Sequence, residues 1–411
     1  MNFLFMGMNY APERTGIAPL TTELCEYLIS QGHCVSVATA FPHYPEWKIQ
    51  TLYRNRLFLR EQINGVVVYR GYVYVPGRPN ARQRILYDTS LGISTFLWGL
   101  AIKDADLIVA IAPPVQLGVF AYILSRLKKR PFVVLLQDLA VDAAVAVGML
   151  KSQTIIHFAH CLEEFVYHRA TDVLVICQGF FDQLISRGVP ASKISLLSNW
   201  VDTTFIRPLD QFNIFRESYG LSDRQFIVLH TGNLGSKQGL SNAIKAAKYI
   251  RDHEDIVFLF VGDGSDKTRL MKMTTQANLT NVRFLPLQPR QILPQMLAAG
   301  NLLLLNQAAG VLDTVLPSKL LTYMAAGRPV IAAVHPESEA AKYVRWANCG
   351  LIIEPDQPKL LADAILYLRE NQNLAQHFGQ NARVFAEEHF ARDRILARYT
   401  DFFSRFEPEN R

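Results

Sequence analysis

Glycine-rich loops placed directly after apolar runs are the part of this sequence best suited to chemistry. Three loops share this placement, around Gly16, at residues 232–239 and at residues 262–264. Glycine allows backbone N–H groups to approach a phosphate closely, and the N-terminus of a following helix adds about half a positive charge. One such loop is most often a tight turn, but three of them predict a binding site for a phosphate-bearing ligand.

A second candidate site lies where Pro317, Ser318 and Lys319 precede an apolar segment that reads as a helix. Proline suits the first turn of a helix, and the serine hydroxyl lies near unpaired backbone N–H groups. A lysine in the first turn opposes the helix dipole, which favours acidic residues there. The segment could be a plain helix followed by a strand, but the lysine favours a bound anion.

Several common catalytic motifs are missing from the sequence. Residues 7–12 lack the GxGxxG pattern of dinucleotide-binding proteins, and the chain contains no GxxxxGK[ST], HExxH, GxSxG or paired-cysteine zinc motif. These absences argue against P-loop enzymes, common dehydrogenases, α/β-hydrolases and zinc enzymes.

Short apolar runs alternate with amphipathic stretches, which predicts an α/β protein with doubly wound parallel sheets. The expected strands are 3–8, 35–40, 66–69, 107–112, 132–136, 173–177 and 194–197, then 226–230, 256–261, 282–285, 302–305, 329–334 and 351–353. A nonperiodic linker at 199–208 separates the two series, and residues from 356 onward look helical. We expect Rossmann-like domains at 1–200 and 201–385, with C-terminal helices at 386–411 that return to the first domain. Ligands of such sheets bind at the carboxyl ends of the strands, so we expect the site in the cleft between the domains.

The order of several motifs resembles the retaining family-4 glycosyltransferases of the GT-B architecture, over essentially the whole chain. The matching stretches are residue 16 with 32–35, then 198–202, 232–240, 260–264 and 324–331. Within that family, residues 41–47, 137–139 and 317–320 are similar to the exopolysaccharide branch, of the colanic-acid type.

This resemblance implies a donor sugar linked to a nucleoside diphosphate, UDP or GDP, bound by the second domain. It also implies a lipid-linked or growing glycan acceptor on the first domain, retention of the anomeric configuration, and no metal or cofactor. The donor residues it implies are Gly16, Gly232, Asn233, Gly235, Lys237, Gln238, Gly262, Gly264, Leu285, Pro317, Ser318, Lys319 and Thr322.

The sequence departs from the family pattern in the loop that holds the diphosphate. The family has a basic pair there, an arginine and a lysine, whereas this chain has Asn233 and Gln238. We expect Lys237 and Lys319, together with the loop amides, to replace that pair.

The two glutamates of the family are also replaced, by Thr314 and Thr322. Those carboxylates ordinarily serve the sugar and the ribose, and Asp313 is a candidate substitute for the first. Their loss motivates two alternatives to a glycosyltransferase. One is a noncatalytic nucleotide-sugar-binding subunit of a polysaccharide assembly, and the other is a nucleotide-sugar 2-epimerase of the same fold.

In the first domain, Asp138 follows an expected strand and is the candidate catalytic residue, because the family places a polar residue near the donor sugar there. Capping of the next helix is an equal alternative, and Asp142 is a weaker candidate. His43 and Trp47 lie in an aromatic, proline-rich loop. They are candidates for acceptor contact, although packing within the loop is the more common role of such a histidine.

The positive charge is concentrated in one segment, residues 47–87. This segment has eight Lys or Arg residues and a single acidic residue, so it carries +7, whereas the whole chain carries +6. Aromatic residues alternate with these cations, a mixture typical of proteins on anionic membranes. Single-stranded nucleic acid and a solvated sheet edge are the alternatives. We expect a membrane partner and no nucleic acid.

The five cysteines form no close pair, which is typical of buried thiols in a reducing compartment. No signal peptide and no apolar run of about 18 residues is evident. We therefore expect a cytoplasmic protein, peripheral on the inner face of the plasma membrane.

Overall fold

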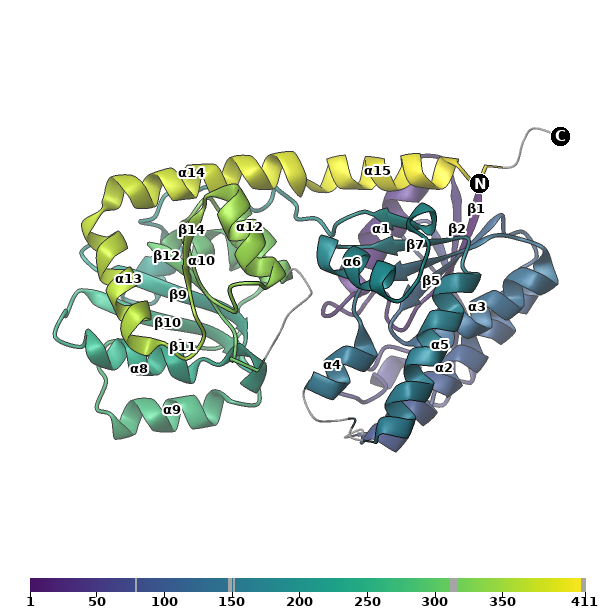
Figure 1. Cartoon of the computed structure of the whole chain (residues 1–411), viewed down its shortest axis with the longest axis horizontal. Coiled ribbons are helices and arrows are strands. Elements are labelled where there is room, and N and C mark those ends of the chain that lie inside the picture. The colour runs from purple at the N-terminus through teal and green to yellow at the C-terminus, as the bar shows by residue number, and fades with distance from the viewer. Residues whose placement is uncertain (78–79, 147–149, 151, 311–316, 408–411) are drawn as a thin grey trace. The chain divides into compact units, whose positions relative to one another are not determined.

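The chain divides into two compact units in a computed structural model (Figure 1), which describes residues 1–77, 80–146, 150, 152–310 and 317–407. Unit 1 comprises Met1–Ser198 and the chain from Leu396 onward, and unit 2 comprises Asn199–Ile395. The division lies two residues before the boundary expected from the sequence. The C-terminal segment joins unit 1 at Leu396, ten residues later than the expected start at 386.

Unit 1 contains an eight-stranded sheet in the order β3-β4-β2-β1-β5-β6-β7-β8. All neighbouring strands are parallel except β3, which pairs antiparallel with β4. The strands are β1 (Asn2–Met6), β2 (Cys34–Ala40), β3 (Phe58–Ile63), β4 (Val66–Gly71), β5 (Leu107–Ala112), β6 (Phe132–Leu136), β7 (Asp172–Val175) and β8 (Ile194–Leu196). The sequence predicted seven of them and missed the edge strand β3, because its residues alternate between exposed and half-buried and include charged ones.

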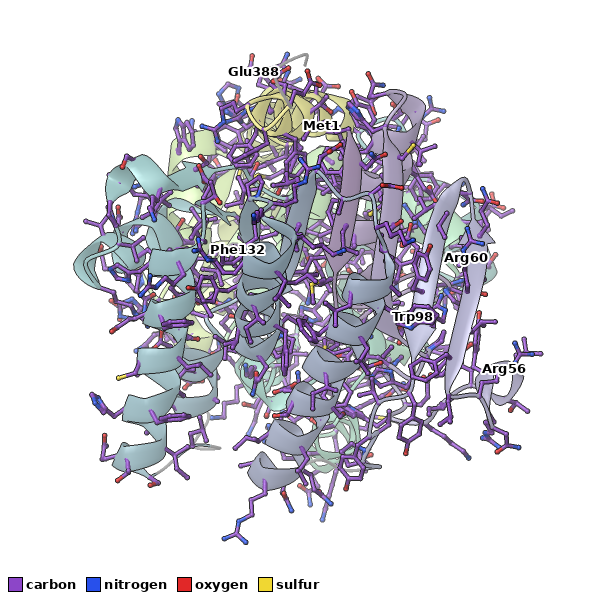
Figure 2. All side chains as sticks on the ribbon, turned by 90° about the vertical axis from the view of Figure 1, so that its right-hand side faces the viewer. Met1, Arg56, Arg60, Trp98, Phe132 and Glu388 are labelled. Carbon is purple, nitrogen blue, oxygen red and sulfur yellow. The ribbon has the colours of Figure 1, made fainter. Side chains whose placement is uncertain are left out.

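The helices of unit 1 are α1 (Ala18–Ser30), α2 (Ala81–Ala101), α3 (Val115–Lys128), α4 (Ala140–Ala146), α5 (Gln153–Arg169) and α6 (Gln178–Ser186), with short 3-10 turns η1 (Thr51–Tyr53) and η2 (Ala191–Lys193). Helices α2, α3 and α5 lie side by side (Figure 2). Glycines allow this close packing. A Cβ added at Gly92 would lie 2.3 Å from the Phe120 ring, and one added at Gly118 would lie 2.4 Å from Val166.

Unit 2 contains a six-stranded parallel sheet in the order β11-β10-β9-β12-β13-β14. Its strands are β9 (Phe226–Asn233), β10 (Ile256–Asp263), β11 (Val282–Leu285), β12 (Leu302–Asn306), β13 (Val330–Ala333) and β14 (Gly350–Ile353). Its helices are α7 (Ile214–Ser218), α8 (Ser241–Tyr249), α9 (Lys267–Gln276), α10 (Leu293–Ala299), α11 (Ser318–Ala325), α12 (Glu339–Ala347), α13 (Pro358–Glu370) and α14 (Gln372–His389), with 3-10 turns η3 (Ser236–Gln238) and η4 (Arg290–Ile292). All six strands lie where the sequence predicted them.

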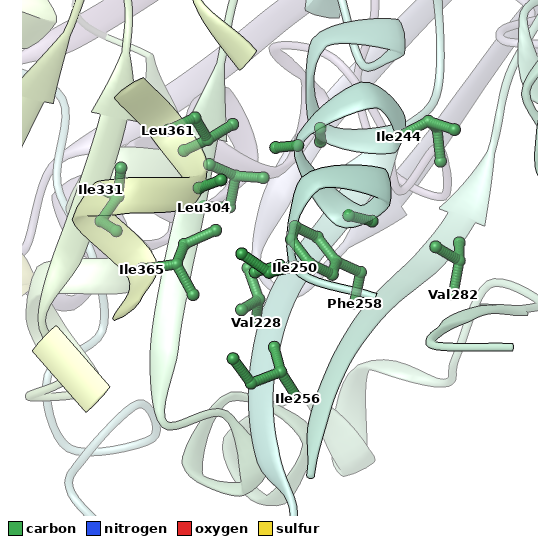
Figure 3. Close-up of a cluster of buried hydrophobic side chains, with 14 of the residues drawn as sticks. Val228, Ile244, Ile250, Ile256, Phe258, Val282, Leu304, Ile331, Leu361 and Ile365 are labelled. Carbon is green, nitrogen blue, oxygen red and sulfur yellow. The ribbon is translucent and has the colours of Figure 1, made fainter. Parts of the chain in front are cut away.

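The core of unit 2 explains why its strands read as unbroken apolar runs. Val228, Phe258 and Leu304 from three neighbouring strands pack against Ile244 of α8 and Ile365 of α13 (Figure 3). Because helices cover the faces of a parallel sheet, its central strands are apolar on both sides. This core fixes the strand ends on which the loops of the candidate site stand.

The segment after residue 198 is held by helix α14. Arg383 donates hydrogen bonds to the carbonyl oxygens of Thr203, Ile206 and Ala325, at 2.8 to 2.9 Å. A final helix, α15 (Arg392–Ser404), then leads into unit 1, where Phe403 packs on Phe3 with ring centroids 5.2 Å apart. The helical character expected from residue 356 onward is therefore confirmed up to residue 404.

The cysteine expectation is only partly met. Cys25, Cys177 and Cys349 are buried, but Cys34 and Cys161 are exposed. Cys34 is the first residue of β2, and Cys161 lies on the exposed face of α5. An apolar neighbourhood in the sequence therefore did not show whether a cysteine side chain faces the core or the solvent. Among the described residues, no helix combines the length and apolar character needed to cross a bilayer.

The close packing of α3 on α5 makes a prediction about Gly118. In most helices, replacing glycine with alanine stabilises the protein by up to about 1 kcal/mol. At Gly118 the added carbon would overlap Val166, and overpacking costs about 1–3 kcal/mol. We expect Gly118→Ala to lower the free energy of unfolding, measured by urea denaturation, despite the higher helix propensity of alanine. Gly77→Ala is the control, since nothing lies within 4 Å of its added carbon. A stabilised Gly118→Ala protein would contradict this packing.

Candidate functional site

Two glycines bring the carboxyl ends of β9 and β10 into close contact. Gly232 and Gly262 are paired in the parallel ladder, with φ angles of +98° and +155°. A Cβ on Gly262 would lie 1.8 Å from the Gly232 carbonyl oxygen. This approach requires glycine at position 262.

The loop after β9 is fixed by an asparagine at the end of β12. The Asn306 side-chain amide donates to the carbonyl oxygens of Gln238 and Gly239, at 2.7 and 3.0 Å. Its own oxygen accepts a hydrogen bond from Asn242 Nδ2 at 3.1 Å. Gly239 closes the turn with a φ of +57°. The loop therefore has one conformation imposed by three separate segments of the chain.

Lys319 reaches across the same strand ends from the first turn of α11. Its Nζ lies 3.1 Å from His230 Nε2 and 3.3 Å from Gln238 Oε1. Its stem passes over Gly232, where an added Cβ would lie 3.6 Å from Lys319 Cε. The amino group is thus placed at the glycine loop, as the sequence predicted for a phosphate site.

Helix α11 is anchored to β9 by a buried tyrosine. The Thr231 backbone N–H donates to the Tyr323 hydroxyl at 3.0 Å. Tyr323 lies four residues after Lys319, one helical turn along the same face. The anchor therefore sets the position from which Lys319 extends.

Burial makes the Lys319 amino group unusual. It lowers the pKa of Lys319 to about 7, from an ordinary value of 10.5. Burial and the adjacent lysine lower the pKa of His230 well below its usual range. His230 Nδ1 donates to the Leu304 carbonyl oxygen at 3.0 Å, so its Nε2 accepts from Lys319. In the part of the chain that the structure describes, no carboxylate lies within ion-pair distance of Lys319, so an anionic ligand would be its counter-charge.

Other residues predicted for the donor lie around these strand ends. Asn233 and Lys237 are exposed on the loop, and the Gly235 backbone lies beside the Asn233 side chain. The Gly264 N–H is already used, since it donates to Asp263 Oδ1 at 2.8 Å. Half-buried Leu285 ends the neighbouring strand β11.

The first turn of α11 supplies the remaining predicted residues of unit 2. Pro317 precedes the helix, and Ser318 is exposed at its first position. The Thr322 hydroxyl donates to the Ser318 carbonyl oxygen at 3.2 Å, one turn along the helix. Thr314 and Asp313 lie outside the described residues.

Gly16 belongs to the other unit. It precedes α1 with a φ of +65°, and an added Cβ would lie 3.5 Å from the Tyr44 ring. This turn requires a left-handed backbone conformation, which favours glycine. Its role toward the donor stays a prediction.

Asp138 lies between β6 and α4 and is half-buried. Its charge contributes to the raised pKa of the buried Tyr167, although burial is the larger cause. Asp142, the weaker candidate, forms an ion pair with Arg187 and accepts a hydrogen bond from Gln183 Nε2 at 2.7 Å. Asp142 therefore ties α4 to α6, and Asp138 stays the candidate catalytic residue of unit 1.

His43 is packed inside unit 1. Its Nδ1 donates to the Phe41 carbonyl oxygen at 2.8 Å, and its Nε2 lies 2.9 Å from the Tyr87 hydroxyl. Burial lowers the pKa of His43, so the ring is neutral and accepts from Tyr87. Half-buried Trp47 contacts both rings, with centroids 5.9 and 5.2 Å away. The packing alternative thus describes His43, whereas acceptor contact by Trp47 stays a prediction.

The buried Glu13 carboxylate holds this loop and was missed in the sequence. It accepts hydrogen bonds from the backbone N–H groups of His43 and Tyr44, at 3.0 and 2.8 Å, and from Asn9 Nδ2 at 3.0 Å. Glu13 therefore connects the β1–α1 loop to the loop after β2.

Three residues of the unit 2 site were also missed in the sequence. They are His230, Asn306 and Tyr323. A signal existed for the first two, because each is a polar residue at the end of an apolar strand, where a buried polar group needs a partner. Among the described residues, no group of His, Cys, Asp and Glu could hold a metal ion.

Comparisons with known proteins agree with this arrangement. Residues 15–200 match the glycosyl transferase 4-like domain, and residues 211–385 match the glycosyl transferases group 1 family. The chain is 31% identical over 407 residues to a putative colanic acid biosynthesis glycosyl transferase, WcaI of Escherichia coli, covering 97% of this chain and 98% of that one.

Solved structures show the same fold at low sequence identity. A sucrose-phosphate synthase from Thermosynechococcus elongatus aligns with a TM-score of 0.75 and 16% identity, over 98% of both chains. Anabaena HepE in complex with UDP aligns with a TM-score of 0.75 and 19% identity, over 98% of this chain and all of that one. The two Rossmann-like units, the two matching domains and the full-length relative lead to one assignment. The chain belongs to the glycosyltransferases that combine a 4-like domain with a group 1 domain in the GT-B fold.

Proposed function

We propose that this glycosyltransferase moves a sugar from a UDP- or GDP-linked donor to a lipid-linked or growing glycan, with retention of configuration, in exopolysaccharide biosynthesis. Polysaccharide biosynthesis is the process that the name of its full-length relative supports. Unit 2 would bind the donor, and unit 1 the acceptor. No resident metal or cofactor is part of the proposal.

One observation carries the donor assignment. The half-buried Lys319 side chain places its amino group at the glycine loop after β9, with no carboxylate partner in the described chain. A diphosphate bound there would supply the missing negative charge and accept from exposed loop amides. Lys319 thereby takes over the role that the family assigns to a basic pair.

The chemistry follows from the charge of the leaving group. Breaking the glycosidic bond to the diphosphate leaves negative charge on its oxygens, so a fixed cation beside them stabilises the transition state more than the ground state. We propose front-face attack by the acceptor, whose proton passes to the leaving phosphate oxygen. Asp138 would act on the reacting sugar.

We also propose that unit 1 docks on an anionic membrane, at a smaller surface than the segment 47–87. Arg70 and Tyr87 are fully buried, so neither can contact lipid. Arg84 pairs with Asp88 at 3.1 Å. Arg78 lies outside the described residues. Among the described cations of the segment, Lys48, Arg54, Arg56, Arg60 and Arg82 stay exposed.

An exposed basic and apolar surface remains around β3 and η1. Arg56 and Arg60 point outward at the sheet edge (Figure 2). Leu52, Leu57 and Phe58 lie beside them, with exposed fractions of 83%, 67% and 55%. Cations and exposed apolar side chains together suit the headgroup region of an anionic bilayer.

The pKa of Lys319 predicts a pH-dependent donor affinity. Bound diphosphate favours the charged amine, so binding takes up a proton above pH 7, and affinity should fall about tenfold per pH unit there. UDP-glucose is the probe for calorimetry. Lys319→Met, neutral and similar in length, should weaken binding by about 1.5–3 kcal/mol near pH 6 and abolish the pH dependence.

Lys237→Met is the matched control. Lys237 is exposed on the same loop, so its removal should leave the pH dependence unchanged. The donor assignment is wrong if Lys319→Met binds as tightly as the original protein, or if affinity is flat between about pH 6 and 9.

Asp138→Asn separates catalysis from helix capping. Asparagine keeps the shape and caps helices well but lacks the charge. We expect turnover to fall about tenfold or more, with the melting temperature nearly unchanged. Asp142→Asn should instead lower the melting temperature, because it weakens the ion pair with Arg187. If Asp138→Asn lowers stability and keeps turnover, capping is its role.

Membrane docking is tested by vesicle co-sedimentation. Neutralising Arg54, Arg56 and Arg60 with glutamine should release the protein from anionic vesicles, since each cation contributes about 1 kcal/mol at such a surface. Raising the salt should have the same effect, and UDP-glucose binding should persist.

The control replaces exposed Lys245, Lys248 and Lys272 of unit 2 with glutamine, which removes the same charge. Equal binding to neutral and anionic vesicles, or equal release by both triple variants, would contradict this docking surface. An oligonucleotide competitor tests the nucleic-acid alternative.

A further inference from the structure

A second strongly basic site lies in unit 1, at the amino ends of β6, β7 and β8. It is a hollow of about 740 Å³. Helix α3 leads into β6, α5 leads into β7, and the turn η2 leads into β8, and these three strands are neighbours in the sheet. The ends of the two helices and the turn therefore lie together and line the hollow. The lining residues are Tyr122, Ser125, Arg126, Lys129, Arg130, Phe132, His168, Arg169, Thr171 and Lys193. The Gly16 loop of unit 1 follows the carboxyl end of β1, whereas this hollow lies at the amino ends of its strands, so the two sites are on opposite edges of the sheet.

The lining of the hollow concentrates positive charge, most of which is not compensated. Five of its described lining residues are Lys or Arg, and none is acidic. Helices α3 and α5 both end here, and each C-terminus contributes only about half a negative charge. The two helix C-termini together therefore neutralise roughly one of the five positive charges.

Some of these cations have structural partners. Lys193 Nζ donates to the carbonyl oxygens of His168 and Ala170, at 2.9 and 3.2 Å. Arg130 lies 3.8 Å from Asp106. These contacts hold the walls of the hollow together and fix where its other cations stand.

Three exposed cations are left to face a ligand. Within the described chain, the side chains of Arg126 and Lys129 have no hydrogen-bond or ion-pair partner. The Arg169 guanidinium lies over the rings of Tyr122 and Phe165, 5.9 and 5.7 Å from their centroids. Stacking on aromatic rings orients a guanidinium while its N–H groups stay available for an anion.

We propose that this hollow binds a phosphate-bearing anion. Guanidinium and ammonium groups bind phosphate oxygens by charge-assisted hydrogen bonds. The Thr171 hydroxyl at the hollow accepts from the Phe132 N–H at 3.2 Å, and its own hydrogen can add a neutral bond. Its volume accommodates a ligand larger than a single phosphate. The same chemistry fits a free phosphate compound or the headgroup of a phosphomonoester lipid, and the experiment separates these two sources. The proposal is independent of the donor assignment.

The test uses a triple variant, Arg126→Gln, Lys129→Gln and Arg169→Gln. Calorimetry with pyrophosphate is carried out in the Lys319→Met background, so that the donor site does not contribute. Losing three charge-assisted contacts should weaken pyrophosphate binding at least about tenfold. The Lys245, Lys248 and Lys272 triple variant removes the same charge elsewhere and should change binding less than about twofold.

A second arm tests the lipid source. Vesicles of phosphatidylcholine with and without phosphatidic acid are co-sedimented with both triple variants and with the Arg54, Arg56 and Arg60 variant. Phosphatidylcholine vesicles that contain phosphatidylglycerol at the same total charge serve as the reference for nonspecific attraction. If the lipid headgroup is the ligand, the parent protein should bind vesicles with phosphatidic acid more tightly than this reference. The hollow variant alone should lose that difference.

The conservative variant Arg126→Lys, Lys129→Arg and Arg169→Lys keeps all three charges and should retain binding, which guards against misfolding as the cause. Loss of binding in either arm, confined to the hollow variant, supports the proposal. Equal behaviour of the hollow and control variants in both arms, or no binding of either probe by the parent protein, would overturn it.

Discussion

The donor end of unit 2 depends on how the Lys319 amino group is held. Burial disfavours its charged form, yet its two contacts are neutral acceptors, His230 and Gln238. The site is therefore built with a cation whose counter-charge is not part of the described chain. The Gly232–Gly262 approach, the Asn306 amide and the Tyr323 anchor all fix the geometry around this one group. A ligand that supplies negative charge completes the site.

Much of this architecture could be predicted from the sequence, because its determinants are local. Apolar runs at 226–230 and 256–261 are buried on both faces. Of the glycines that follow them, Gly262 cannot be replaced without a clash, and Gly232 has a φ of +98° that favours glycine. Such patterns locate the strands and the loops at the strand ends, but not the order of the strands in each sheet. The edge strand β3 was missed because a strand with one covered side and charged residues lacks that signal.

The partners within the site could not be predicted in the same way. Lys319 and His230 are 89 residues apart, and Asn306 is separated from Gln238 by 68. Only the folded sheet shows that these side chains meet. Charge counting failed for a related reason, since Arg70 contributes to the basic segment in the sequence but is buried against Glu61 in the fold.

The two units differ in how their functional cations are exposed to solvent. In unit 2 the half-buried Lys319 places its amino group beside the glycine loop, whereas unit 1 has exposed cations at the β3 edge and at the hollow beside α3 and α5. A single buried charge gives strong, directional binding, because the local dielectric is low. Exposed charges act together and are screened by salt, which suits attraction to a surface.

The most direct test of the central claim is a crystal structure of the protein with a UDP-sugar bound. The account predicts a diphosphate oxygen within hydrogen-bond distance of Lys319 Nζ, at the loop that follows β9. A diphosphate bound away from Lys319, with the lysine still on His230 and Gln238 alone, would contradict it.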